Sequence, residues 1–209
     1  DGSIADRDLL LERRAGFGHT VTGGYAGPTH QITTAADDGP GSLREALAQP
    51  GPLWIVFSAD FTITVRSGLP VTSNKTIDGR GRRVLITGHN QPGLIADGTT
   101  NIIVENLYLR DFGDTERTKF NDTPDAILLE NGARTIWIDH CSLSKAGDKL
   151  ISVNGGATDV TVSWCRLFEQ EQVFQVCCQA TQDRDSNTCV TAHHNFFDRT
   201  GYRNPVVSY

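Results

Sequence analysis

The sequence predicts an all-β protein built as a parallel β-helix, a solenoid of stacked coils. From about residue 51 onward, short apolar runs recur, separated by Gly, Asn and Asp. The runs are too short for helices and too numerous for one open sheet, and the absence of amphipathic helical segments between them argues against βαβ units. The expected strands are Trp54–Phe57, Val84–Thr87, Asn101–Val104, Ala126–Leu129, Ile136–Ile138, Val160–Val162, Val173–Val176, Val190–Ala192 and Val206–Val207.

A repeat that aligns without gaps is the observation that favours a solenoid most. Four segments match, at 103–108, 138–143, 162–167 and 192–197, and a coil of about 22 residues with insertions on one side accounts for their spacing. Equivalent positions on stacked strands lie about 4.8 Å apart. We therefore expect the fourth positions to form one column, with asparagine amides bonding to adjacent coils. These positions are Asn106, Cys141, Cys165 and Asn195.

The cysteines do not indicate a metal site, because the sequence has no CxxC pair and no zinc-like His/Cys spacing. Cys141 and Cys165 are expected to be stacked neighbours in the column. We interpret them as two small buried residues, and a disulfide between them is the less favoured alternative. The odd count of five leaves at least one thiol unpaired in a monomer.

Composition and charge exclude several classes of protein. No run of about 18 apolar residues is present, so we expect no membrane span. The formal net charge is −6 and Lys and Arg are not clustered, which argues against nucleic-acid binding. The sequence lacks Met, which is compatible with a removed signal peptide and a secreted protein. Because Tyr209 ends an apolar run with no capping helix, we expect a native chain that continues or a fragment.

We expect one domain over 1–209, with an N-terminal segment and capping helix over about 1–50 and coils over about 51–209. The helix is predicted at Ser42–Gln49. Ser42 is its expected N-cap, Glu45 reaches back to form a capping box, and Pro50 ends it. Such a short helix needs tertiary support, so we expect it to cover the end of the solenoid.

Several motifs resemble those of the pectate lyase family (polysaccharide lyase family 1), and they occur in that family's order across nearly the whole chain. The resemblance implies a right-handed, pectin lyase-like parallel β-helix. It also implies β-elimination in an acidic polysaccharide such as polygalacturonate, in which a base removes the C5 proton of a uronic acid. The matching segments are 16–18, 41–47, 52–57, 75–81 (KTIDGRG), 137–140 (WIDH), 160–163 and 203–205 (RNP).

The resemblance assigns roles to three residues. Arg203 matches the catalytic arginine, although an ordinary guanidinium, with a pKa above about 12, is a poor base and would favour an anion-binding role. Asp125 and Asp148 match calcium ligands, and calcium would stabilise the charge that develops on the substrate. For both aspartates, solvated turn residues are the alternative interpretation.

The sequence also departs from the family pattern. Ser152 and Thr123 stand where further acidic ligands are common, so we expect Ca²⁺ to bind weakly without substrate. Ser208 replaces a second arginine, and a substrate-binding lysine is replaced by Gln172 or a neighbour. A calcium-independent pectin lyase does not explain these losses, because that branch places an arginine near the metal position and none is found.

We therefore expect a monomeric lyase that binds pectate and neither nucleic acid nor membranes. The alternatives are a carbohydrate-binding β-helix that has lost catalysis, which Ser152 and Ser208 favour, and a lyase acting on a different uronide. Three histidines, His140, His193 and His194, are interpreted as structural rather than as nucleophiles or metal ligands. Trp137 and Trp164 are expected to pack within the solenoid.

Overall fold

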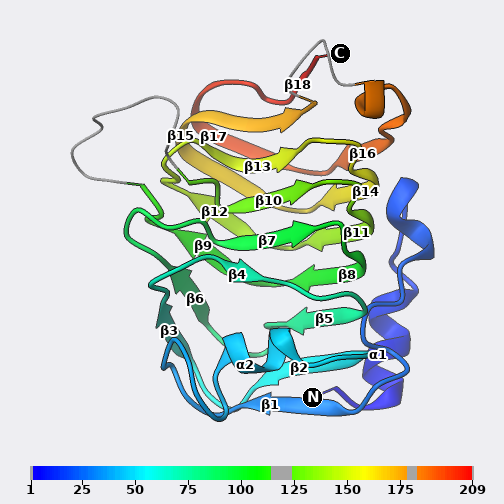
Figure 1. Ribbon diagram of the computed structural model, residues 1–209, viewed down its shortest axis with the longest axis vertical. Coiled ribbons are helices and arrows are strands. Elements are labelled where there is room, and N and C mark those ends of the chain that lie inside the picture. Colours follow the sequence, from blue (N-terminus) through cyan, green and yellow to red (C-terminus); the bar gives the residue numbers. More distant parts are fainter. Residues whose placement is uncertain (1, 114–123, 178–182, 209) are drawn as a thin grey trace.

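A computed structural model describes residues 2–113, 124–177 and 183–208. Parallel strands stack in coils along one long axis, which confirms the predicted β-helix (Figure 1). Among the described residues, no helix is both long and apolar enough to cross a membrane.

One wall of the solenoid is a seven-stranded sheet whose spatial order equals its order in the chain. Successive strands pair in parallel, as each coil adds one strand to this wall. The wall consists of β1 (Thr29–Ile32), β2 (Leu53–Phe57), β5 (Lys75–Asp78), β8 (Thr100–Glu105), β11 (Arg134–Asp139), β14 (Thr158–Ser163) and β16 (Val190–His193).

The other two walls are joined by β15 (Arg166–Val176), a strand long enough to contribute to both, where the sequence predicted a separate strand at Val173–Val176. The first wall contains β3 (Phe61–Thr64), β6 (Val84–Thr87), β9 (Tyr108–Arg110), β12 (Ser142–Ser144) and β17 (Phe196–Tyr202). The second contains β4 (Leu69–Pro70), β7 (Leu94–Asp97), β10 (Ile127–Glu130), β13 (Lys149–Val153) and β18 (Val206–Val207).

Aliphatic side chains from all three walls fill the interior and form one continuous core. The predicted helix is present as α2 (Leu43–Ala48), with Ser42 at its N-cap, and it covers the N-terminal end of the coils (Figure 1). The Ser42 hydroxyl accepts the N–H of Glu45, whereas the Glu45 carboxylate reaches Gly41 N–H rather than the cap residue. Exposed strand edges promote aggregation, so this cap protects the end of the core.

The N-terminal segment covers the outer face of the seven-stranded wall, an arrangement that the sequence did not predict. It contains α1 (Ile4–Leu11) and the short 3₁₀ helix η1 (Phe17–Thr20). Leu10 and Val21 pack on Trp54, Ile103 and Trp137 in a second apolar cluster outside the coils. A short 3₁₀ helix, η2 (Asp183–Asn187), lies near the other end of the chain.

The predicted column is correct for three of its four members and wrong for Asn106. The register pairs Glu105 with Asp139, which places Asn106 level with His140, one position earlier than the sequence alignment assumed. Asn106 instead belongs to a bend with a left-handed backbone, which follows the last four strands of the seven-stranded wall, β8, β11, β14 and β16. The residues at this bend are Asn106, His140, Trp164 and His194, with φ values of 54°, 51°, 52° and 53°.

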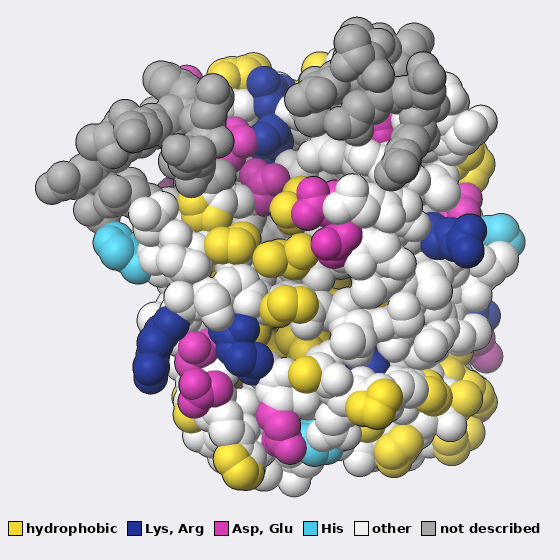
Figure 2. All heavy atoms as spheres, in the orientation of Figure 1, with side chains coloured by type: hydrophobic (Ala, Val, Ile, Leu, Met, Phe, Trp, Pro, Cys, Tyr) yellow, Lys and Arg dark blue, Asp and Glu magenta, His cyan; other side chains and the backbone are white. Residues whose placement is uncertain are grey.

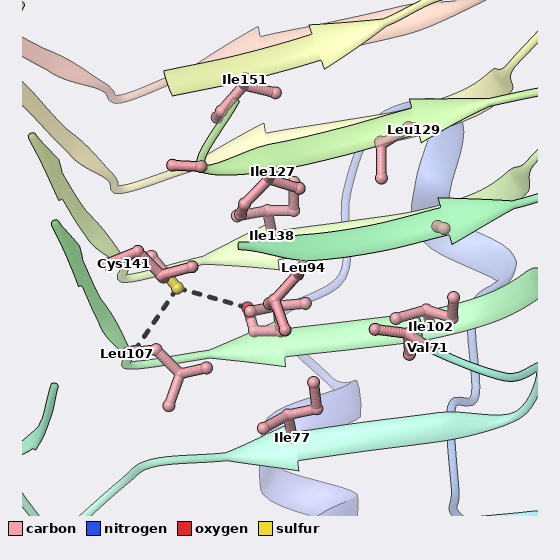
Figure 3. Close-up of a cluster of buried hydrophobic side chains, with 14 of the residues drawn as sticks. Val71, Ile77, Leu94, Ile102, Leu107, Ile127, Leu129, Ile138, Cys141 and Ile151 are labelled. Atoms are coloured by element: carbon pink, nitrogen blue, oxygen red, sulfur yellow. Dashed lines mark hydrogen bonds between the residues drawn. The ribbon is translucent and has the colours of Figure 1, made fainter. Parts of the chain in front are cut away.

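The true column lies directly after this bend and contains Leu107, Cys141, Cys165 and Asn195. Cys141 Sγ points into the core and lies 3.5 Å from Leu107 N and 3.6 Å from Val104 O (Figure 3). Both thiols are buried and free, which confirms the interpretation as small buried residues. Cys189 is free as well, and Cys178 lies outside the described residues.

The two tryptophans differ. Trp137 is buried, as expected, and its indole donates to Ser163 Oγ at 2.8 Å. The expectation was wrong for Trp164, which is 53% exposed at the bend and stacks between His140 and His194, with ring centroids 6.0 and 4.2 Å away. Its place at the bend turns the side chain away from the packed walls.

We predict that Asn195→Ala lowers the free energy of unfolding by about 1–3 kcal/mol, because it leaves two backbone groups without partners. The Asn195 amide accepts from Cys165 N–H at 2.9 Å and donates to Val162 O at 2.8 Å, tying two coils together. Urea denaturation measures the change, and replacing the exposed Asn187 with Ala is the control. Equal stability of both variants would contradict this role.

Candidate active site

The residues assigned by resemblance lie on the wall that contains β7, β10, β13 and β18. Asp125 stands two residues before β10, where Gly93 N–H donates to its carbonyl at 3.0 Å and Ala126 N–H donates to Lys149 O at 3.0 Å. These bonds place Asp125 beside Lys149, the first residue of the next strand. Figure 2 shows this face, on which acidic and basic side chains gather above a vertical band of hydrophobic ones.

Asp125 and Asp148 lie on adjacent coils, and they are brought together around Lys149. The Lys149 ammonium donates to Asp148 Oδ2 and lies 3.8 Å from Asp125 Oδ1. The backbone N–H of Lys149 donates to the same Asp125 oxygen at 2.9 Å. One residue therefore supplies positive charge and a hydrogen bond to the predicted calcium ligands.

The three charged groups are mostly buried, with side-chain exposures of 11% for Asp125, 12% for Lys149 and 20% for Asp148. Burial raises the pKa of the Asp125 carboxyl, and the charge of Asp148 adds to the rise. The Lys149 ammonium and the nearby Ser152 hydroxyl oppose it. The ammonium thus favours the ionised form of a carboxyl that burial would otherwise neutralise.

Arg203 reaches the same wall from the coil after β15. Its carbonyl accepts Phe174 N–H at 2.8 Å, and its Nη1 donates to Gln175 Oε1. Gln175 is the register partner of Ser152 on β13, so it lies between the arginine and the strand that holds Lys149. The predicted base and the two predicted ligands therefore lie on the same wall, on strands that pair in register.

A role for Lys149 was not predicted from the sequence, because only carboxylates and arginines were expected at the metal position. The sequence does contain a signal for this role, because Lys149 is a basic residue directly after Asp148. Strand register places it beside Asp125. Register also pairs Lys149 with Gln172 and Gln172 with Tyr202. Gln172 stands where some family members have a substrate-binding lysine. Its register partner on the preceding coil, Lys149, supplies a positive charge beside that position.

The donor set around Asp125 does not fit a preformed calcium site. Its two carboxylates already bind an ammonium, and Ser152 stands where the family often has a third acid. Within the described ranges, no third His, Cys, Asp or Glu side chain joins this pair in a metal-sized group. Thr123, the other departure noted in the sequence, lies outside the described residues.

A second acidic cluster lies on the seven-stranded wall, away from Arg203. Ligand atoms of Glu105, Asp139 and His140 lie within 4.8 Å of one another. Arg13 of the N-terminal segment covers them, with Nη2 3.1 Å from Glu105 and 3.8 Å from Asp139. Burial, followed by the charge of Asp139, raises the pKa of Glu105 to about 8, while Arg13 lowers it. We interpret this cluster as an anchor for the N-terminal segment.

A family model described as "Pectate lyase" matches residues 62–209. The chain belongs to the pectate lyase family. Its curated relatives include "Probable pectate lyase P56" of Solanum lycopersicum, 35% identical over 93% of this chain, and "Pectate lyase 4" of Ambrosia artemisiifolia, 36% identical over 93%. The chain spans 52% of the length of each, about half.

Solved structures agree with the fold of this pectate lyase family member. Jun a 1, the major allergen from cedar pollen, superimposes with a TM-score of 0.87 at 30% identity over 96% of this chain and 62% of that one. Pectate lyase Bsp165PelA from Bacillus sp. N165, solved in complex with trigalacturonate, superimposes with a TM-score of 0.64 at 20% identity, over 93% and 64% of the two chains. The second likeness supports the parallel β-helix alone.

We predict that Glu105→Gln alters the dependence of stability on pH. The folded pKa of Glu105, about 8, is raised above its ordinary value of 4.5, so the folded state retains a proton that the unfolded state releases. Between these values the free energy of unfolding should fall with rising pH, by up to about 1.4 kcal/mol per unit from this group. The variant should lose that contribution.

Urea denaturation of both proteins at about pH 5, 7 and 9 measures the difference. The stability of the variant relative to the unmodified protein should increase from pH 5 to pH 9. Parallel profiles would show that Glu105 ionises normally in the folded protein.

Proposed function

We propose that the full-length protein is a secreted, monomeric polysaccharide lyase that cleaves polygalacturonate-like chains by β-elimination. The observation that carries the proposal is that Arg203 and Lys149 lie on one wall of a pectate lyase β-helix. A uronate needs a cation at its carboxylate and a base at C5, and these two side chains offer both. The local cations also offset the repulsion between an acidic protein, with net charge −6, and an acidic polymer.

In this proposal Arg203 takes the C5 proton of the uronic acid. The C–H electron pair forms the C4–C5 double bond, and the C4–O bond breaks so that the leaving chain departs as an alcohol after taking up a proton. Gln175 holds one N–H of the guanidinium, and within the described part of the chain no other hydrogen-bond acceptor engages it. The remaining donors of its planar fork are left for the substrate.

Calcium has no step in this proposal. The sequence predicted Ca²⁺ at Asp125 and Asp148, and the Lys149 ammonium already neutralises part of their charge. The expectation of weak calcium binding in the free protein stays a prediction.

A binding protein that has lost catalysis is the second candidate, favoured by Ser208 at the position of the family's second arginine. Its hydroxyl donates to Cys177 O at 3.1 Å, so it contributes to the last coil rather than to positive charge. Elimination forms a double bond conjugated with the uronate carboxylate, and its ultraviolet absorbance distinguishes a lyase from a binder.

We predict that Arg203→Ala abolishes ultraviolet-absorbing product from polygalacturonate, with a loss of at least about 100-fold in kcat, because general bases contribute about 10²–10⁴-fold. Arg203→Lys should also fail, since lysine lacks the planar fork. The control is Arg134→Ala, an exposed arginine on the seven-stranded wall. Near-normal turnover by Arg203→Ala would place the base elsewhere, and absence of product from the unmodified protein would favour the binder.

A further inference from the structure

Lys149 occupies the position in this wall where two aspartates converge. Its ammonium contacts Asp148 Oδ2 and lies 3.8 Å from Asp125 Oδ1, and its side chain is 12% exposed. An ammonium has three N–H donors and no acceptor. The hydrogen bond to Asp148 uses one donor, and the Asp125 oxygen at 3.8 Å forms an ion pair beyond hydrogen-bond distance, so donors remain for an anionic group arriving from solvent.

The charges around Lys149 leave little negative charge for a divalent cation. Two carboxylates and one ammonium leave a single net negative charge, and Ser152, fully buried on the same strand, adds none. The backbone N–H of Lys149 also occupies one Asp125 oxygen. A divalent ion would have to displace the ammonium, compete with that hydrogen bond and bind without a third carboxylate, although Ca²⁺ prefers six to eight oxygen ligands.

We propose that Lys149 is a tethered cation that replaces a divalent metal ion in this site and binds the uronate carboxylate of the substrate. This inference rests on the proposed function. Asp125 and Asp148 hold the ammonium in place. The elimination therefore proceeds without calcium, and Lys149 stabilises the charge that develops on the substrate carboxylate as the C5 proton leaves.

Calorimetry tests the replacement without relying on activity. In the full-length protein, Ca²⁺ should show no binding tighter than about 1 mM, the weak end of protein calcium sites. Lys149→Met, which keeps the length of the side chain and removes its charge, should tighten binding at least about tenfold. Combining Lys149→Met with Ser152→Asp should tighten it further, because calcium affinity follows the number of charged ligands.

The matched control is Arg134→Met, which removes the same charge from an exposed position on the seven-stranded wall and should leave calcium binding unchanged. Circular dichroism checks that every variant retains the β-helix. Binding by the unmodified protein tighter than about 0.1 mM would overturn the proposal, and so would a Lys149→Met protein that binds calcium no better.

Activity on polygalacturonate separates this inference from the function on which it rests. The unmodified protein should produce unsaturated product equally well in chelator and in calcium. Lys149→Met should lose at least about 100-fold in chelator and recover part of the loss in millimolar calcium. Activity that requires calcium in the unmodified protein would overturn the tethered cation and leave the lyase intact. Absence of product under every condition would overturn the lyase, while the calorimetry still decides whether Lys149 excludes calcium.

Discussion

The left-handed bend that follows the last four strands of the seven-stranded wall, β8, β11, β14 and β16, is the constraint on which the rest of the structure depends. At this position the chain leaves one wall and enters the next after only two residues, so any shift in its place would change the face of every side chain that follows. Four consecutive coils place Asn106, His140, Trp164 and His194 there, with φ between 51° and 54°. A left-handed residue other than glycine costs on the order of 1 kcal/mol or more. Stacking of Trp164 between the two histidine rings offsets part of this cost.

Because the bend recurs in successive coils, it also keeps the strands in register in the distant wall that holds the site. Because the coils stay in register, Lys149 pairs with Gln172 and Ser152 pairs with Gln175. Asp125 and Asp148 come from different coils, and they meet because each lies within two residues of the start of a strand of the same wall. The site is therefore built by strand register, and its residues do not need to be close in the sequence.

The sequence predicted the parts of this molecule that depend on periodicity and on motif. The solenoid, the helix at Leu43–Ala48 and the stacking of Cys141 on Cys165 all follow from repeated apolar positions or capping chemistry. The left-handed bend could not be predicted in the same way, because Asn, His and Trp occupy it instead of glycine. Aligning Asn106 with a cysteine rather than with His140 was the direct result. The packing of the N-terminal segment was also missed, since its apolar contacts are made with strands far away in the chain.

The role of Lys149 required distances that no sequence pattern contains. A carboxylate and an ammonium about 4 Å apart attract by about 4 kcal/mol at an effective dielectric constant of about 20, so the contacts of Lys149 with its two aspartates are of that order before desolvation. A divalent ion held by the same carboxylates would be repelled by the ammonium by about twice as much at that distance. The Lys149 ammonium in its observed position therefore weakens the binding of calcium in this site. Loss of an acid at Ser152 and presence of a base at Lys149 act in the same direction, because each reduces the charge available to a metal. Both changes remain compatible with binding an acidic sugar, because the positive charge that its carboxylate needs can come from the Lys149 ammonium instead of a calcium ion.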